Sequence, residues 1–282
     1  PIYDSKAGWA DSVKMLMNNL YDGQNIYFDY SQIRPEGARL RTMGGRASGP
    51  QPLVKLHDFI RETMHNAQGR KLTTLEAHDI CNQIAEIVVV GGVRRSSQIS
   101  LSDLDDTEMR HAKEWPFPIK RAMANNSAIF REKPTAAQFL KEWAALALSG
   151  TGERGIFNRE AAVKQVESIG RRDSSYEFGC NPCSEIILRD GQFCNLTEVV
   201  IRAEDTQKDI IRKVRLATIL GTFQASLTNL KRLRKKWLSN TKEEALLGVS
   251  LTGIMDNSFM NGSSKGRGVS EWNSGLLNLP DF

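Results

Sequence analysis

Three of the four cysteines in the 282-residue sequence lie close together, at positions 180, 183 and 194. Cys180 and Cys183 have the spacing of a zinc or redox pair, but a structural zinc site needs four ligands and the four histidines all lie far upstream. A thioredoxin-like pair normally opens a helix after a strand, whereas the SEIIL residues that follow Cys183 are typical of a strand. We therefore predict no metal here, and the pattern does not favour a redox pair.

Asn181, Cys183 and Glu185 alternate along the chain, so in extended backbone their side chains would project from one face. The thiol can exchange a proton or a hydrogen atom, the carboxylate can accept a proton from a hydroxyl, and the amide can orient hydroxyl groups. One substrate could therefore meet all three groups. The alternative is a tight turn at Asn181-Pro182 beside a buried, inert Cys183.

The elements that must position these residues follow from the spacing of apolar side chains. This spacing predicts helices over residues 8–20, 53–66, 73–90, 136–148 and 210–230. It predicts strands over residues 26–30, 94–101, 127–130 and 185–188, and a further element within 246–255. Residues 31–52 contain so many glycines and prolines that we expect a long loop. The alternation favours an α/β sheet with crossover helices, in which functional groups gather at the carboxyl ends of strands.

Composition excludes several classes of protein. Hydrophobic residues make up 40% and charged residues 25%, which is typical of a globular protein rather than a disordered or fibrous one. The net charge of +5 is modest, no apolar run approaches the roughly 20 residues that cross a bilayer, and no export signal is present. Four cysteines are too few for a secreted disulfide scaffold, so we expect a cytoplasmic protein. The chain begins with Pro1, which suggests an excerpt or a processed product.

The segment from Asn181 to Glu185 resembles the Asn-x-Cys-x-Glu finger loop of ribonucleotide reductases. Cys194 follows where that family carries one cysteine of its reducing pair. More blocks occur in the family's order: SQIRPEGARL, GGRASGPQPL, VVVGGVRRSSQISL, ANNSAIF, CNLTEV and LLGVSLTGIMDN. Together these blocks are similar to the adenosylcobalamin-dependent, class II catalytic subunit, above all to its monomeric, triphosphate-reducing type.

The resemblance implies a fold. Residues 1–257 would form part of a ten-stranded α/β barrel with a central finger loop near 179–185 and an effector or specificity loop near 91–97. Residues 258–282, which are rich in Gly and Ser, would be a polar insertion or the start of the next barrel element.

The resemblance also implies a reaction, the reduction of ribonucleotides to 2′-deoxyribonucleotides with adenosylcobalamin as cofactor. A radical from the cofactor would take the hydrogen of Cys183, and the resulting thiyl would remove the substrate's 3′ hydrogen. Glu185 would accept the 3′-hydroxyl proton, and Asn181 would hold the ribose hydroxyls. Cys194 would be half of the dithiol that reduces the intermediate as the 2′-hydroxyl leaves as water, and an external, thioredoxin-like dithiol would restore it.

Further residues are similar to the family's nucleotide-binding segments. Gly91, Gly92, Arg94 and Arg95 match the loop that couples a bound deoxynucleotide effector to substrate choice; paired glycines permit close backbone approach, and guanidinium groups suit phosphate or base edges. The alternative is a plain helix-to-strand turn with solvated arginines.

Two other segments carry candidate binding residues. The segment from Gly44 to Pro50, with Ser48, can cradle substrate or merely turn. Asn125 and Asn126 can line the substrate pocket or cap a strand end.

The chain departs from the family pattern at several points. A second barrel cysteine upstream of the finger loop is missing, since the upstream Cys81 lies in a predicted helix, where we expect it to be core. The phosphate-binding loop and the C-terminal cysteine pair are also missing. We therefore expect an internal portion of the catalytic subunit that is inactive alone, either a gene fragment or one part of a split enzyme whose barrel a complementary chain completes.

Three other functions compete with this hypothesis. A non-catalytic nucleotide-binding module would keep the 91–97 loop but would not need the Asn181, Cys183 and Glu185 set. A class I reductase subunit would share many of the same blocks. A nucleic-acid-binding protein would use the basic run from Lys231 to Lys236, which we instead expect to end a helix as a solvated face; we expect neither nucleic acid nor a membrane as partner.

Overall fold

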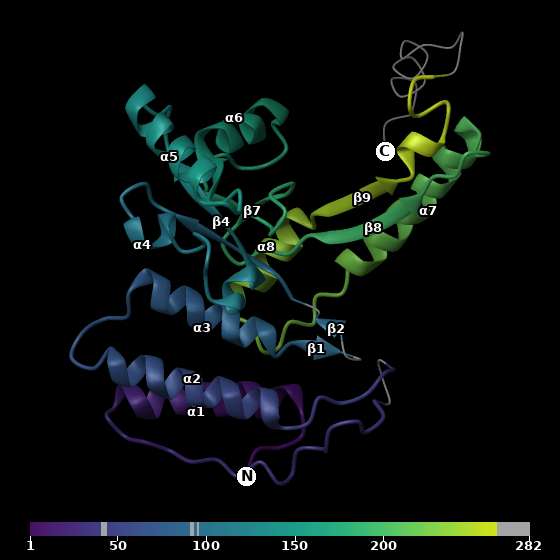
Figure 1. The fold of residues 1–282 in the computed structure, drawn as a ribbon. Coiled ribbons are helices and arrows are strands. Elements are labelled where there is room, and N and C mark those ends of the chain that lie inside the picture. Colours follow the sequence, from purple (N-terminus) through teal and green to yellow (C-terminus); the bar gives the residue numbers. More distant parts are fainter. Residues whose placement is uncertain (41–43, 91–92, 95, 264–282) are drawn as a thin grey trace. The chain divides into compact units, whose positions relative to one another are not determined.

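A computed structural model describes residues 1–40, 44–90, 93–94 and 96–263 (Figure 1). The chain divides into two compact units, Pro1–Ile187 and Leu188–Phe282. Helices alternate with strands, as predicted for an α/β protein. The described strands form four small sheets, so the ten-stranded barrel and its central finger loop stay predictions. The domain division at residue 257 likewise stays a prediction.

Three helices open the first unit: α1 (Lys6–Tyr21), α2 (Gln51–Asn66) and α3 (Thr74–Glu86). The hydroxyl of Ser5 accepts a hydrogen bond from the amide of Gly8 (3.0 Å) and so caps α1. Thr73 and Glu76 form a capping box at the start of α3. The three helices that the spacing predicted here are confirmed, except that the third, predicted to run to residue 90, ends at Glu86.

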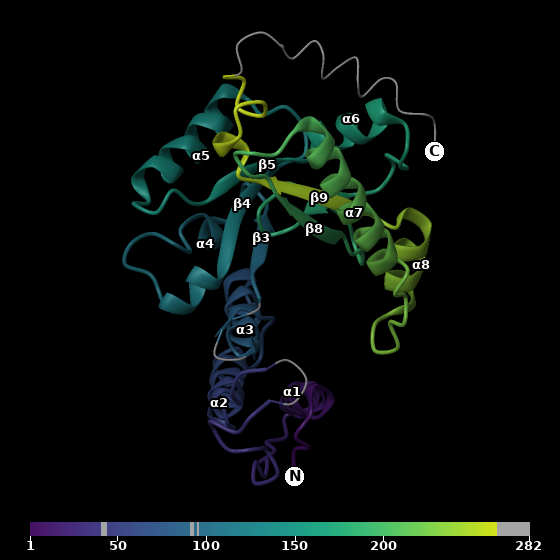
Figure 2. The ribbon, with the colours of Figure 1, turned by 90° about the vertical axis from the view of Figure 1, so that its right-hand side faces the viewer.

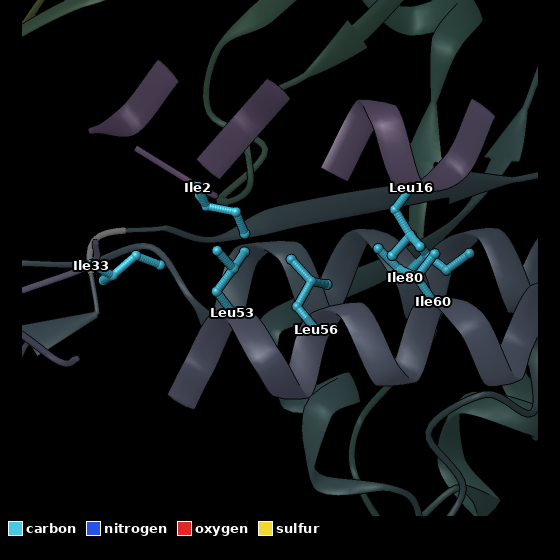
Figure 3. Packing of buried hydrophobic residues seen from close by; sticks show 7 residues of the cluster. All are labelled: Ile2, Leu16, Ile33, Leu53, Leu56, Ile60 and Ile80. Atoms are coloured by element: carbon cyan, nitrogen blue, oxygen red, sulfur yellow. The ribbon is translucent and has the colours of Figure 1, made fainter. Parts of the chain in front are cut away.

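The core of this helical layer is apolar. Figure 3 shows Leu53, Leu56 and Ile60 of α2 packed with side chains from α1, α3 and the segments beside them, and the whole cluster comprises Ile2, Leu16, Ile33, Leu53, Leu56, Ile60 and Ile80. The strand predicted over residues 26–30 is wrong. The alternating apolar side chains of residues 26–30 do pack against this cluster, but the backbone of the segment forms no strand. Its contact with the N-terminus is a hydrogen bond from Ile2 N to Asp29 O (2.9 Å).

Cys81 lies on α3 as predicted, but its predicted place in the core is wrong. The side chain is exposed. The buried face of α3 instead carries polar groups, because His78 and Asn82 hydrogen-bond to the neighbouring strand.

A parallel sheet follows the helices, in the order β3 (Gln98–Ser102), β4 (Ala124–Phe130) and β5 (Gly155–Asn158). The crossover between β3 and β4 holds α4 (Thr107–Arg110) and the 3₁₀ helix η1 (Ile119–Met123), and that between β4 and β5 holds α5 (Ala136–Leu148). The strand predicted over 94–101 is split, since β2 (Val93–Arg94) pairs with β1 (Val89–Val90) before β3 begins. The predicted crossover connections are confirmed.

Charged groups are buried beside this sheet. Of the residues in α5, Glu142 is the buried one, and its carboxylate binds Arg110 (2.7 Å) and Arg154 (3.0 Å), both of which are also buried. Burial alone would raise the pKa of Glu142, but the hydrogen bonds and charges of the two guanidinium groups outweigh it and hold that pKa below its usual value. The apolar helix that the sequence predicted is therefore fixed to the sheet through an ion cluster.

The first unit ends with α6 (Arg159–Ile169), β6 (Phe178–Cys180) and the start of β7 (Ile187–Arg189), which pairs with β6. The helix α6 occupies part of the stretch 164–183, for which the sequence predicted only a polar approach to the cysteines. It begins at Asn158, whose side chain caps it, and ends at the left-handed Gly170.

The second unit is built on two parallel strands, β8 (Asn195–Val200) and β9 (Leu247–Thr252), joined by α7 (Gln207–Ala225) and α8 (Lys235–Glu244) and followed by the 3₁₀ helix η2 (Ile254–Asp256). The helix α7 lies along both strands (Figure 2). A Cβ at Gly221 would come within 2.0 Å of Leu247 Cδ1, so this close approach requires glycine.

The basic run from Lys231 to Lys236 is placed differently from the prediction. It precedes α8 and forms its first turn instead of ending a helix. Positive charges there do not complement the helix dipole; Lys236 instead pairs with Asp190.

Candidate functional site

The segment that carries Cys183 is a tight loop between β6 and β7, and we call residues 181–186 the cysteine loop. Ser184 N donates to Asn181 O (2.9 Å), which closes a turn around Pro182 and Cys183. The two ends of the loop are joined by Asn181 N to Ile186 O (3.2 Å) and by Ile186 N to Asn181 Oδ1 (3.0 Å). Ser184 adopts a left-handed backbone (φ 69°).

The predicted extended backbone across Asn181, Cys183 and Glu185 is therefore wrong. Pro182 favours a turn, and the Asn181 side chain satisfies a loop amide, so the three side chains do not alternate along a strand. The tight turn that the sequence offered as the alternative is confirmed. Its companion, a buried and inert Cys183, is wrong, because Cys183 and Glu185 are both exposed.

The cysteine loop is fixed to the parallel sheet by a residue far away in sequence. Asn125 Nδ2, on β4, donates to the carbonyl oxygen of Pro182 (2.7 Å). Beside it, a Cβ added at Gly179 would lie 3.4 Å from Leu101 Cδ1 of β3, which is ordinary packing contact. The structure thus brings Asn125, a predicted binding residue, next to the loop that carries Cys183.

Cys180 and Cys183 are free thiols, and no disulfide includes Cys81 or Cys194. Cys180 is half-buried, and its sulfur donates to Ser184 Oγ (3.6 Å) across the loop. Burial raises the pKa of Cys180, against the smaller opposing effect of the Ser184 hydrogen bond. Cys180 therefore stays protonated at neutral pH, while Cys183 lies on the exposed turn.

The remaining predicted site residues of the first unit are spread over several elements. Asn126 is buried on β4, and its backbone N donates to Glu153 Oε2 (2.9 Å). The side-chain atoms Nδ2 and Oδ1 of Asn126 make no hydrogen bond within the described part of the chain. Ser48 is half-buried in the loop before α2, 3.5 Å from Gly49 O.

The predicted effector loop falls largely on residues that the structure does not describe. Arg94 lies in β2, where it pairs with Val89. Gly91, Gly92 and Arg95 lie outside the described residues.

Cys194 belongs to the second unit, directly before β8, and is half-buried. Its role in a reducing pair stays a prediction.

In residues 1–40, 44–90, 93–94 and 96–263, no group of three or more His, Cys, Asp or Glu side chains is placed to hold a metal ion. Across the same residues, none of the helices combines the length and apolar character needed to cross a membrane.

Comparison with known proteins gives three kinds of match. A family model described as "B12-dependent ribonucleotide reductase, insertion domain" matches residues 1–64. Adenosylcobalamin-dependent ribonucleoside-triphosphate reductases from Lactobacillus delbrueckii subsp. bulgaricus and Lactobacillus leichmannii are 31% and 30% identical over 272 residues, which is 90% of this chain and 35% of each relative. A crystal structure of a B-12 dependent (class II) ribonucleotide reductase matches with a TM-score of 0.61 and 25% identity, over 90% of this chain and 36% of that chain.

These matches confirm the resemblance to adenosylcobalamin-dependent ribonucleotide reductases, in sequence and in fold. The chain spans about a third of the length of the curated relatives that it matches. The family model covers α1 and nearly all of α2, a region that the sequence alone had not marked as an insertion domain.

Proposed function

We propose that this chain is part of the catalytic subunit of an adenosylcobalamin-dependent ribonucleotide reductase, which reduces ribonucleotides, as triphosphates, to 2′-deoxyribonucleotides. One observation carries the proposal: a single tight turn holds Cys183, a free thiol, together with Asn181 and Glu185. The shielding from water that this chemistry needs has to come from outside the described residues, because Cys183 is exposed there. The relatives that match over most of this chain are named as such reductases, which supports this function over a pure nucleotide-binding module and over a class I enzyme.

In this proposal each group of the cysteine loop has one task. Cys183, as a thiyl, removes the 3′ hydrogen of the ribose and returns a hydrogen at the end. Glu185 is exposed and accepts the 3′-hydroxyl proton. The Asn181 oxygen already accepts a bond from Ile186 N, so we assign ribose binding to its Nδ2 donor.

The reduction itself needs two electrons. Cys194 and a second thiol supply them by forming a disulfide as the 2′-hydroxyl leaves as water, and an external dithiol then reduces that disulfide. No disulfide joins any of the four cysteines, which agrees with a reducing compartment, and we place the reaction in the cytoplasm.

The exposed thiol also suits the cofactor. Adenosylcobalamin supplies, when bound, the radical that begins the reaction. Cys183 can meet it because the residue is exposed and no disulfide occupies its sulfur. A deoxynucleotide effector is proposed to act through the loop at residues 91–97.

A thiyl must be kept from water and oxygen, so the exposed Cys183 implies a further cover. Apolar side chains on the outer face of α7 are also exposed, at Ile211, Leu216, Ile219, Leu220 and Phe223. In the described part of the chain, β3, β5, β8 and β9 are edge strands, each of which hydrogen-bonds to a neighbouring strand on one side only. We propose that a complementary polypeptide covers these surfaces, and that the chain alone is inactive.

Complementation tests this function. The chain should form no deoxynucleotide from a ribonucleoside triphosphate by itself. It should do so when combined with the flanking portions of the longer protein, adenosylcobalamin and a dithiol. Omission of the cofactor or of the dithiol is the control and should stop turnover. A completed protein that binds nucleotide but yields no deoxynucleotide under any of these conditions would overturn the proposal.

A further inference from the structure

The peptide group that joins Pro182 to Cys183 has a direct anchor on the sheet. Its carbonyl oxygen accepts the 2.7 Å bond from Asn125 Nδ2, and its nitrogen belongs to Cys183 itself. The hydrogen bonds within the cysteine loop join Asn181 to Ser184 and Ile186, and none of these uses Pro182 O. The Asn125 bond therefore adds a constraint that the loop does not provide for itself.

The anchor stands on a fixed part of β4. Lys113 Nζ donates to Ala124 O (2.8 Å), just before Asn125, and Asn126 N donates to Glu153 Oε2 (2.9 Å), just after it. Lys113 and Glu153 also form an ion pair of 2.6 Å with both side chains largely buried. The strand on either side of Asn125 is thus held by one buried charge pair, which makes Asn125 a rigid support.

We propose that Asn125 is a positioning residue that sets the orientation of the Cys183 turn, rather than a ligand of the substrate. This inference rests on the proposed role of Cys183. An amide donor on a strand that pairs on both sides can hold a turn more closely than a residue on a loop can. Cys183, Ser184 and Glu185 are exposed, so the turn buries little apolar surface of its own and gains order from such a bond.

Hydrogen exchange of this chain tests the anchor without any enzyme activity. Asn125→Asp keeps the size of the side chain but removes the donor, and Asn125→Ala removes the side chain beyond Cβ. In both variants, the amides of Ser184 and Ile186 should exchange roughly fivefold faster, as expected for the loss of one neutral hydrogen bond. Peptides from β3 and β5 should exchange as in the parent chain.

Asn261→Asp is the matched control, because Asn261 Nδ2 makes the same kind of bond to Met255 O (2.9 Å) in the second unit. It should leave exchange in the cysteine loop unchanged. Unchanged loop exchange in both Asn125 variants would overturn the anchor. Faster exchange throughout the first unit would overturn it as well, since Asn125 would then serve general stability.

A kinetic arm uses the completed enzyme. Asn125→Asp should lower kcat at least tenfold with KM within twofold of the parent, because the residue acts through the loop. A raised KM with unchanged kcat would make Asn125 a substrate ligand and overturn the inference. A parent enzyme without turnover would instead contradict the proposed function, while the exchange result would still decide whether Asn125 anchors the turn.

Discussion

The helices α2 and α5 bury opposite kinds of side chain. The α2 helix buries Leu53, Leu56 and Ile60 in a shared apolar core, whereas α5 buries Glu142 and leaves Leu140 and Trp143 exposed. The N-terminal helical layer is thus held by apolar packing, whereas α5 is attached to the sheet region by an ion cluster and leaves apolar side chains exposed. The two helices are therefore held by different forces and should respond differently to substitution and to pH.

The largest effect on stability should come from Glu142→Ala. Arg110 and Arg154 would stay buried without their carboxylate, and breaking a buried ion pair in this way typically costs about 3–5 kcal/mol. Urea unfolding of the parent chain and the variant measures the loss. Glu160→Ala is the control, since Glu160 pairs with Lys164 on the surface and should cost less than about 0.5 kcal/mol. Equal losses in Glu142→Ala and Glu160→Ala would show that the buried ion cluster does not stabilise the fold more than a surface pair does.

The apolar side of the comparison is tested by Leu56→Ala, which should cost about 2–5 kcal/mol because it leaves a cavity in the α1–α2 core. Leu140→Ala removes the same atoms from the exposed face of α5 and should change stability by about 0.5 kcal/mol or less. The free energy of unfolding of each variant, compared with that of the parent chain, measures both losses. A large loss at Leu140 would mean that the face of α5 is already covered in the isolated chain.

The two regions should also lose stability in different pH windows. Burial lowers the pKa of His57 from 6.5 to about 4, so His57 stabilises the fold fully above pH 6.5 and loses this contribution as the pH falls toward 4. The loss should reach about 3 kcal/mol. His78 also has a lowered pKa, because of its burial, and acts in the same direction.

The Glu142 contribution follows the rule for a carboxyl with a lowered pKa. It is present above the ordinary carboxyl pKa of 4.5 and is lost as the pH falls below it. Between pH 7 and 4 the free energy of unfolding should therefore fall mainly because the histidines become protonated. In His57→Gln this free energy should depend less steeply on pH. An unchanged slope in His57→Gln would contradict the assignment.

The smallest effect on stability is expected on the outer face of α7. Leu220→Ser combined with Phe223→Ser should change the free energy of unfolding by no more than about 1 kcal/mol, because both side chains are exposed. Self-association of the isolated chain, measured by sedimentation, should fall, since these residues form part of the uncovered apolar face. A stable monomer in both the parent chain and the variant would speak against a partner at this surface.

Local sequence signals predicted the elements whose stability is local. Thr73 and Glu76 mark the start of α3 because a capping box needs only residues three apart. The strands β3 and β4 and the helix α5 also fell in predicted segments, whereas β5 and β8 were not predicted, and the strand predicted over 185–188 begins only at Ile187. The strand prediction for residues 26–30 was wrong because alternating apolar residues also occur where a segment without strand pairing lies on a helical layer. Phe28 and Tyr30 pack against the helices in this way.

The candidate site was predictable in its residue types but not in its geometry. Alternation placed Asn181, Cys183 and Glu185 on one face, yet a proline and an asparagine that bonds to its own loop favour a turn. Asn125 came from a resemblance and was assigned to nucleotide binding; its bond to Pro182 O joins residues 57 positions apart, which no local pattern reveals. The buried polar face of α3 was missed for the same reason, because its partners lie on β3.

The central claim is that the Cys183 thiol carries the radical step, and its most direct test is Cys183→Ser in the completed enzyme. Deoxynucleotide formation should be abolished while binding of the deoxynucleotide effector is unchanged. Cys81→Ser, at an exposed position on α3, should retain full turnover as the matched control. Turnover of Cys183→Ser close to that of the parent enzyme would contradict the account.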